Sequence, residues 1–256
     1  MAENQYGFPT EVLSLPSQGL LYPEDSPLRS GTIDVKYMTA KEEDILTSVN
    51  LINQGKVIDK LLESVIADPK IKLKDMLIGD KNAVLVASRI LGYGQEYSFM
   101  YKNPNTSEDE QVTVDLTEAS DKELDESLII DGRNEFSFTL PISKIQVTFK
   151  LLTHGDEQII ERELKGLKKI NKTSTSDLTT RMKHIITSID GDIEKKTIRE
   201  YVDSEFLARD ARELRNYLKK IQPSVDLSYD YEDQRGNVTT INIPVGINFF
   251  WLDATV

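Results

Sequence analysis

The chain has 256 residues, of which 39% are hydrophobic and 29% are charged, and its formal net charge is −12 at pH 7. A chain of this length can bury a core without disulfides, and it has no cysteine, which excludes thiolate nucleophiles and cysteine-ligated metals and fits a reducing compartment. The negative charge argues against general binding to nucleic acid, and the sequence holds no run of 18 apolar residues that would predict a membrane span.

The first 31 residues are predicted to form an extended arm. Proline restricts itself and its predecessor to extended backbone, and four prolines stand here: Pro9, Pro16, Pro23 and Pro27. The first residues lack the basic and apolar regions of a signal peptide, so the protein is expected to stay in the compartment where it is made. The arm also carries apolar side chains that a solvated tail would not need. We therefore expect Leu15, Leu20 and Tyr22 to be buried, against this chain or a neighbour.

One strand and three helices are predicted after the arm. Alternating apolar and polar residues predict the strand, and the capping-box pattern of Thr39 and Glu42 predicts the start of the first helix. Asp80 is predicted to cap the third helix, whose centre is apolar on all sides, as in a helix buried in a core. The strand is expected at residues 32–38, and the helices at 41–49, 57–67 and from 80 onward.

Two antiparallel hairpins are predicted next, because the apolar pattern changes to period two after Gly92. The first pairs residues 96–102 with 111–116, and the second pairs residues 134–140 with 144–151. Residues 103–126 carry nine acidic groups and one base, Lys122. Such a stretch is either a solvated surface or a binding surface for a basic partner, and both interpretations stay open.

The remainder is predicted to be mainly helical and to end in a hairpin. Thr153 and Asp156 repeat the capping signature, and a stripe of apolar residues marks the last helix most clearly. That stripe consists of Leu207, Ala211, Leu214, Leu218 and Ile221. Helices are expected at residues 157–170, 176–189, 194–203 and 204–221, and strands at 225–231 and 237–244.

These elements predict an α+β fold in which the helices are segregated from antiparallel β-hairpins and an extended arm precedes both. No internal repeat is evident. We expect three units: an extended arm at residues 1–31, an N-terminal α+β lobe with hairpins at 32–152, and a helical lobe closed by a C-terminal hairpin at 153–256.

The histidines do not indicate an enzyme, although histidine is the usual acid or base at neutral pH. His154 stands at a predicted turn without any nucleophile motif, so we interpret it as a solvated turn residue. His184 is predicted to be a surface or half-buried residue of a helix. We therefore expect no catalytic residues.

Two segments resemble ligand-binding motifs only in part. Residues 190–194 begin like a calcium loop, but Lys195 and Tyr201 stand where a glycine and a glutamate are required. The segment Gly92-Tyr93-Gly94 begins like a dinucleotide fingerprint, but it follows a helix and is better explained as a helix end. We expect no metal site and no cofactor.

Three features favour contacts with other proteins. The first is the set of apolar arm residues. The second is the basic face of the last helix, with Arg212, Arg215 and Lys219. This face would match an acidic surface on a neighbouring copy or partner, or else it is an ordinary solvated face. The third is an aromatic C-terminal segment, which either binds a partner or packs on the protein's own core. The predicted partner-binding residues are Leu15, Leu20, Tyr22, Arg212, Arg215, Phe249, Phe250 and Trp251.

Several segments, by their order and spacing, carry a family resemblance across nearly the whole chain. They are residues 15–23 (LPSQGLLYP), 38–46 (MTAKEEDIL), 79–83 with 89–94 (GDKNA and RILGYG), 209–215 (RDARELR) and 249–251 (FFW). Together they resemble the baseplate hub subunit family of T-even-type bacteriophages. The resemblance implies a structural protein at the centre of a contractile tail's baseplate, on which the tail tube assembles.

The resemblance also implies partners and a location. The partners are expected to be other baseplate and tail proteins or further copies of this chain, in the host cytoplasm during assembly and in the virion baseplate if the protein is retained. Two alternative functions stay open. One is a tail-assembly chaperone that is absent from the mature virion, and the other is a tail-associated cell-wall hydrolase, for which the sequence offers no acid/base pair.

Overall fold

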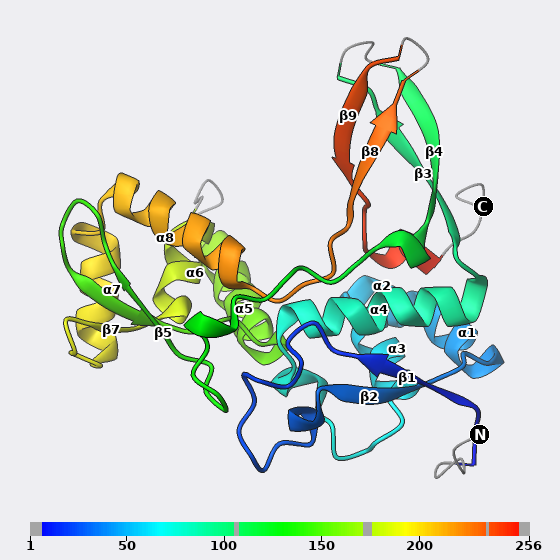
Figure 1. The fold of residues 1–256 in the computed structure, drawn as a ribbon, viewed down its shortest axis with the longest axis horizontal. Coiled ribbons are helices and arrows are strands. Elements are labelled where there is room, and N and C mark those ends of the chain that lie inside the picture. Colours follow the sequence, from blue (N-terminus) through cyan, green and yellow to red (C-terminus); the bar gives the residue numbers. More distant parts are fainter. Residues whose placement is uncertain (1–6, 105–107, 171–175, 234–235, 251–256) are drawn as a thin grey trace.

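The computed structural model describes residues 7–104, 108–170, 176–233 and 236–250. Over these ranges the protein is mixed α+β, with eight α-helices and small antiparallel sheets of two or three strands, which confirms the predicted fold class. Figure 1 shows three parts: an N-terminal body, a helical lobe and a long β-structure that projects from the body. We call this projection, formed by strands β3, β4, β8 and β9, the β-finger.

The N-terminal body packs a two-stranded sheet beside four helices. The Thr39 side chain accepts a hydrogen bond from a backbone N–H at the start of the first helix, and the carboxylate of Glu42 accepts one from the backbone N–H of Thr39, so the predicted capping box is confirmed. The predicted third helix begins before Asp80, with Leu77 as its N-cap residue, so the prediction that Asp80 caps it was wrong. The elements of the body are β1 (Thr10–Ser14), β2 (Thr32–Lys36), α1 (Ala40–Leu46), α2 (Val49–Gln54), α3 (Val57–Val65) and α4 (Ile78–Tyr93).

The N-terminal segment is extended but lies against the body. Strand β1 pairs antiparallel with β2, and a short 3-10 helix at Pro27–Ser30 turns the chain between them. The predicted burial of Leu15 and Tyr22 is confirmed, since they are 1% and 5% exposed, while Leu20 is half-buried. Within the described residues, this burial is provided by the chain itself.

The helical lobe combines four helices with a three-stranded antiparallel sheet. The prediction of one helix over residues 176–189 was wrong in its last four residues, because α6 ends at Ile185 and residues 186–189 form a strand. Those residues, Ile-Thr-Ser-Ile, are mostly β-branched and pair with the edge of the neighbouring hairpin. The elements are β5 (Phe136–Thr139), β6 (Gln146–Phe149), α5 (His154–Ile170), α6 (Asp177–Ile185), β7 (Ile186–Ile189), α7 (Lys195–Ser204) and α8 (Ala208–Ile221).

Helix α8 buries most of the predicted apolar stripe. It begins at Ala208 rather than at residue 204, and Leu207 is its half-exposed N-cap residue. The carboxylate of Asp210, in the first turn, accepts hydrogen bonds of 2.8 Å and 3.0 Å from the backbone N–H groups of Ile142 and Ser143. Helix α8 is therefore attached to the turn between β5 and β6 by a buried polar contact as well as by apolar packing.

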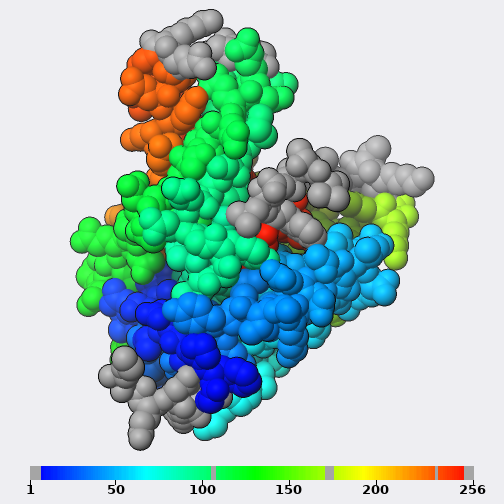
Figure 2. Space-filling model, turned by 90° about the vertical axis from the view of Figure 1, so that its right-hand side faces the viewer, coloured from blue at the N-terminus to red at the C-terminus, as the bar shows by residue number. Residues whose placement is uncertain are grey.

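The β-finger consists of two hairpins that pack face to face (Figures 1 and 2). Its strands are β3 (Glu96–Lys102), β4 (Asp109–Asp115), β8 (Ser228–Glu232) and β9 (Val238–Asn242). The rings of Tyr101 and Tyr231 meet edge to face between the hairpins at 5.7 Å, and the Tyr231 hydroxyl donates a hydrogen bond to Glu110. This hydrogen bond raises the pKa of Tyr231 to about 12. The C-terminal hairpin therefore completes a structure that begins much earlier in the chain.

Several contacts cross the boundary expected near residue 152. Strand β6 lies before it and pairs with β7, which lies after it. One connected hydrophobic core also has members on both sides, from Leu15 to Phe250. The division into lobes at residues 32–152 and 153–256 stays a prediction about domain organisation. Over the described ranges, no helix is both long and apolar enough to cross a bilayer.

Candidate interaction surfaces

His154 lies in a buried polar network at the first turn of α5. Its Nε2 is 2.9 Å from a carboxylate oxygen of Asp59, and its Nδ1 is 3.4 Å from Nζ of Lys81. The side chain is only 7% exposed, so the prediction of a solvated turn histidine was wrong. The cause is the close approach of Gly155 to the backbone of Lys74, which presses the first turn of α5 onto the body.

Burial, hydrogen bonds and neighbouring charges shift the pKa values of the groups in this network. Burial alone would raise the pKa of Asp59, but hydrogen bonds from His154 and Gln158 outweigh it and hold that pKa below its ordinary value. Burial lowers the pKa of Lys81, against the opposing field of Asp59. Because the three groups come from α3, α4 and α5, the network joins the body to the helical lobe.

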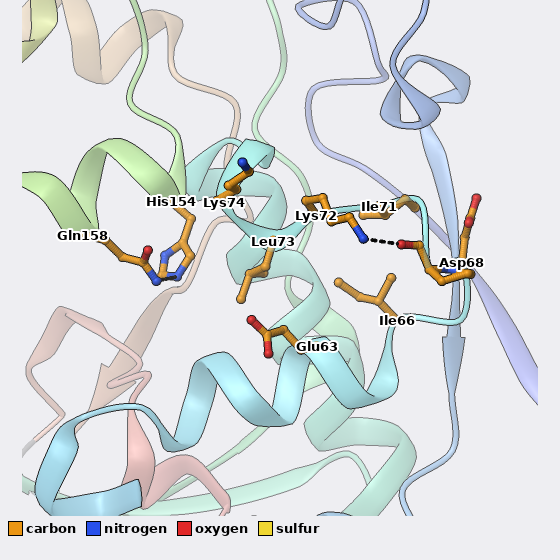
Figure 3. Close-up of a pocket in the computed structure, with 10 residues that line it drawn as sticks. Glu63, Ile66, Asp68, Ile71, Lys72, Leu73, Lys74, His154 and Gln158 are labelled. Carbon is orange, nitrogen blue, oxygen red and sulfur yellow. Dashed lines mark hydrogen bonds between the residues drawn. The ribbon is translucent and has the colours of Figure 1, made fainter.

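A cavity of about 440 Å³ lies beside His154. Figure 3 shows His154 and Gln158 on one side of it, with Glu63, Leu73 and Ile66 along the others. Its described lining also includes two lysines and an aspartate. It has no serine, threonine, tyrosine or cysteine, the usual oxygen and sulfur nucleophiles. The described lining therefore has no hydroxyl or thiol that the Asp59–His154 pair could activate as a nucleophile.

The other ligand-like segments are structural. His184 is half-buried as predicted, with Nε2 2.8 Å from Glu163. Asp190 accepts a hydrogen bond from the backbone of Gln146 and forms a tight turn after β7. Gly94 ends α4 with its N–H bound to the carbonyl of Ile90, which confirms the predicted helix end. In the part of the chain that the structure describes, no group of three or more acidic or histidine side chains is placed to hold a metal ion.

A buried joint holds the N-terminal segment on α4. The carboxylate of Asp80 is 0% exposed and accepts three hydrogen bonds: 2.9 Å from Ser17 N, 2.6 Å from Ser17 Oγ and 2.6 Å from the hydroxyl of Tyr22. The Tyr22 hydroxyl in turn accepts a hydrogen bond of 2.8 Å from the backbone of Leu77. Tyr22 is thus a buried member of a polar network, and its predicted role in partner binding stays a prediction.

A second joint holds the C-terminal segment and the β-finger on the same helix. Arg89 is 1% exposed, and its guanidinium donates hydrogen bonds to the backbone carbonyls of Phe249, Gly94 and Glu96 at 2.9, 2.7 and 2.9 Å. Its charge lies 5.5 Å from the ring centre of Tyr93, within the range of a cation–π contact. The buried charge is therefore balanced by carbonyl dipoles and an aromatic face.

The aromatic C-terminal segment packs on the protein's own core. Phe249 and Phe250 are 1% and 3% exposed, and the Phe249 ring meets Tyr97 edge to face at 4.7 Å. Of the two interpretations of the segment, packing on its own core is the one observed for these two rings. Contact with a partner through them would require the core to open, and that role stays a prediction. Trp251 lies outside the described residues.

A groove runs between α6 and α8 and has a volume of about 430 Å³. The α6 wall combines apolar side chains with Asp177 and Arg181, while the α8 wall carries the basic residues Arg215 and Lys219. Arg212 is also exposed on α8, but it does not line the groove. The apolar residues of the lining are Ile78, Leu151, Leu152, Leu178, Met182, Ile185 and Leu218.

The rim of this groove has uncompensated positive charge. Arg181 is held by Glu157 at 2.7 Å and by Asp177 at 3.2 Å, and Lys150 is held by Asp156 at 2.7 Å. Arg215 donates only to the backbone carbonyl of Ala211, and neither it nor Lys219 forms an ion pair with a described residue. An apolar groove with free cations on one side suits an acidic partner that carries apolar side chains.

These features define a structural α+β protein: its buried charges serve as joints between segments, and its surfaces offer a projecting β-finger and a basic groove. The chain belongs to the T4 bacteriophage base plate protein family, which it matches over residues 20–250. No curated protein and no solved structure matches the chain. The family assigns it a structural role in the baseplate of the phage tail and is generally non-enzymatic.

The roles of two charged residues that organise the fold, Asp80 and Arg89, were not predicted from the sequence, which indicated only a helix cap at Asp80. Both stand in a helix that was predicted to be buried on all sides, and a charge in such a helix must find polar partners inside the core. A charged residue in a helix predicted to be buried was therefore the one sign in the sequence that a buried polar contact had to exist. Ser17 lies 63 residues from Asp80 and Phe249 lies 160 residues from Arg89, so no local pattern could identify these two partners.

Proposed function

We propose that this chain is a subunit of the central hub of a contractile-tail baseplate. In this proposal it is made and assembled in the host cytoplasm, remains in the virion and acts through contacts with other baseplate and tail proteins. The match to the baseplate family over residues 20–250 is the observation that carries the proposal. The order of the segments that resemble hub subunits adds to it.

The surfaces of the molecule support a binding role. The exposed bases of α8 and the acidic outer end of the β-finger offer charged surfaces of opposite sign. Complementary charges guide association and fix the orientation of subunits, which suits a component that must be placed in a defined position. The net charge of −12 supports protein partners over nucleic acid.

The proposal is tested by mass spectrometry of purified virions. A hub subunit must be present in a fixed ratio to known baseplate proteins, and it must remain after washes that remove loosely bound proteins. The matched control is a tail-assembly chaperone of the same phage, which should be present in the infected-cell lysate and absent from the virion.

The alternative within the same family role is a chaperone that binds hub or tape-measure proteins and then leaves. It would co-purify with tail proteins from infected cells but would be missing from the virion. Co-purification from lysates, followed by imaging of the complex, would then show which proteins it holds. Absence from both virions and tail intermediates would contradict both proposals.

A further inference from the structure

The outer end of the β-finger is acidic and carries an exposed apolar side chain. Four carboxylates are exposed there, Glu108 and Asp109 on the first hairpin and Asp230 and Glu232 on the second. Lys102 is the one base among the described residues of this end, and Arg235 of the connecting turn lies outside them. We call these four acids, together with Val238, the fingertip.

Val238 is unusual because it is 64% exposed at the start of β9. It stands directly across from Glu232 in the strand pairing, and Asp230 lies on the same outer face of the hairpin, since alternate residues of a strand share a face. The inward face of the hairpin packs on the first hairpin through Tyr231. The outward face thus presents an apolar side chain next to two carboxylates.

The fingertip and the α6–α8 groove are complementary. The groove offers apolar side chains and the free cations Arg215 and Lys219, whereas the fingertip offers Val238 and exposed carboxylates. A volume of about 430 Å³ holds a few side chains rather than a folded hairpin, so Val238 would enter the groove while the acids meet its rim. Within the described residues, the groove lining comes from α6, α8 with the following Gln222, Ile78, residues 150–152 and Glu157, and none of it comes from the finger.

We propose that the fingertip of one copy docks into the α6–α8 groove of a second copy of this chain. Figure 1 shows the finger projecting from the body and the α6 and α8 helices in a different part of the molecule. A contact between two different surfaces is heterologous, so each copy keeps one free fingertip and one free groove. Such contacts continue from copy to copy and close into a ring where the rotation between subunits permits.

The proposal goes beyond the hub assignment and is tested without any other phage protein. The purified full chain is examined by sedimentation velocity over a wide range of concentration, at salt concentrations of about 0.05 M and about 0.5 M. We expect concentration-dependent association that weakens at the higher salt, because the contact depends on partly exposed charges. A chain that stays monomeric at low salt overturns the proposal.

Charge reversal on either surface identifies the contact. A groove variant (Arg215→Glu with Lys219→Glu) and a fingertip variant (Asp230→Lys with Glu232→Lys) should each weaken association about tenfold or more. The control variant Lys41→Glu with Lys56→Glu changes the net charge as the groove variant does, at exposed sites on the body, and should associate like the unaltered chain. An equal loss in the control shows nonspecific charge effects and overturns the proposal.

A mixture of the two variants provides the decisive measurement. The intact fingertip of the groove variant fits the intact groove of the fingertip variant, and the two reversed surfaces are again opposite in sign. Mixing should therefore restore association that neither variant shows alone. Variants that melt like the unaltered chain but do not restore association when mixed overturn the assignment of these two surfaces. Association of unreduced strength in either variant alone overturns it as well.

Discussion

At the scale of single residues, two buried charged side chains, Asp80 and Arg89, are held by hydrogen bonds to uncharged groups. Asp80 is satisfied by hydroxyl and amide donors, and Arg89 by carbonyl oxygens. Burial raises the pKa of Asp80, and the hydrogen bonds from Ser17 and Tyr22 oppose that shift only in part. Burial also raises the pKa of Tyr22, and the charge of Asp80 acts in the same direction. Such networks are costly to break because a remaining partner is left unsatisfied.

The substitution Tyr22→Phe tests the joint on α4. It keeps the ring but removes the hydroxyl that donates to Asp80 and accepts from the backbone of Leu77. We expect the free energy of unfolding to fall by about 1–3 kcal/mol, because two buried polar groups lose a partner. Urea denaturation measures this. Tyr37→Phe is the control, since the Tyr37 side chain is 40% exposed, and it should change stability by less than about 0.5 kcal/mol. Equal effects would contradict the assigned role of the joint.

At the scale of elements, local patterns located most helices and strands. The strand at Glu96–Lys102 has the predicted bounds, and the capping boxes at Thr39 and Thr153 are both formed. The last four residues of the helix predicted at 176–189 instead form β7, because an edge of the β5–β6 hairpin was available to pair with them. Propensity decides an element's type only where tertiary pairing does not compete.

The pH dependence of stability tests the cap of α5. Burial would raise the pKa of Asp156, but hydrogen bonds from Lys150 and Thr153 outweigh it, so its folded pKa lies below the ordinary value. The stabilisation is therefore present above the unfolded pKa of about 3.9 and is lost as the pH falls through the lower folded pKa. We expect Asp156→Asn to cost about 1–2 kcal/mol near neutral pH, and less as the pH drops below about 4.

Denaturation of both proteins across this pH range provides the measurement. The difference in the free energy of unfolding between the original chain and Asp156→Asn isolates the contribution of Asp156, because the other acidic groups are present in both proteins. Asp44→Asn, at an exposed position in α1, is the control and should change the free energy of unfolding by less than about 0.5 kcal/mol. A difference for Asp156→Asn that stays constant down to the lowest pH would contradict an ionised Asp156 as the source of the stabilisation.

At the scale of the whole molecule, α4 is the element on which the separate parts meet. Asp80 holds the N-terminal segment, Gly79 touches the segment that leads into the C-terminal hairpin, and Arg89 holds both the β-finger and the aromatic C-terminal segment. The segments that carry the family resemblance include these residues and several of their partners. The resemblance is thus concentrated at joints of the fold, which fits a structural role.

Gly79→Ala tests the close backbone approach between α4 and the segment before the C-terminal hairpin. A Cβ atom at this position would lie 1.7 Å from the carbonyl oxygen of Pro223, so one of the two backbones must move. We expect a loss of about 1–3 kcal/mol or more in the free energy of unfolding. Gly166→Ala is the matched control, because it also lies in a helix but has open space around it, and it should be neutral or stabilising.

Arg89→Met tests the attachment of the β-finger to the body. Methionine fills much of the volume but leaves three backbone carbonyls, of which that of Phe249 is buried, without their donor. We expect a loss of more than about 2 kcal/mol, together with faster hydrogen exchange in β3 and β9 than in α8. Exchange followed by mass spectrometry resolves these segments. Uniformly faster exchange over all three would show a global loss of stability and contradict a joint specific to the finger.

The sequence alone determined the fold class and the positions of most elements, because capping and periodicity depend on neighbouring residues. It also determined the resemblance to baseplate proteins, because the residues that carry the resemblance are spread along the whole chain. Only the tertiary structure decided that β7 joins β6, that two distant hairpins form one finger, and that His154, Asp80 and Arg89 are buried in joints. These outcomes depend on which surfaces meet when the chain closes on itself. A charge in an apolar helix shows that a partner must exist, but only the folded chain brings that partner within a hydrogen bond of it.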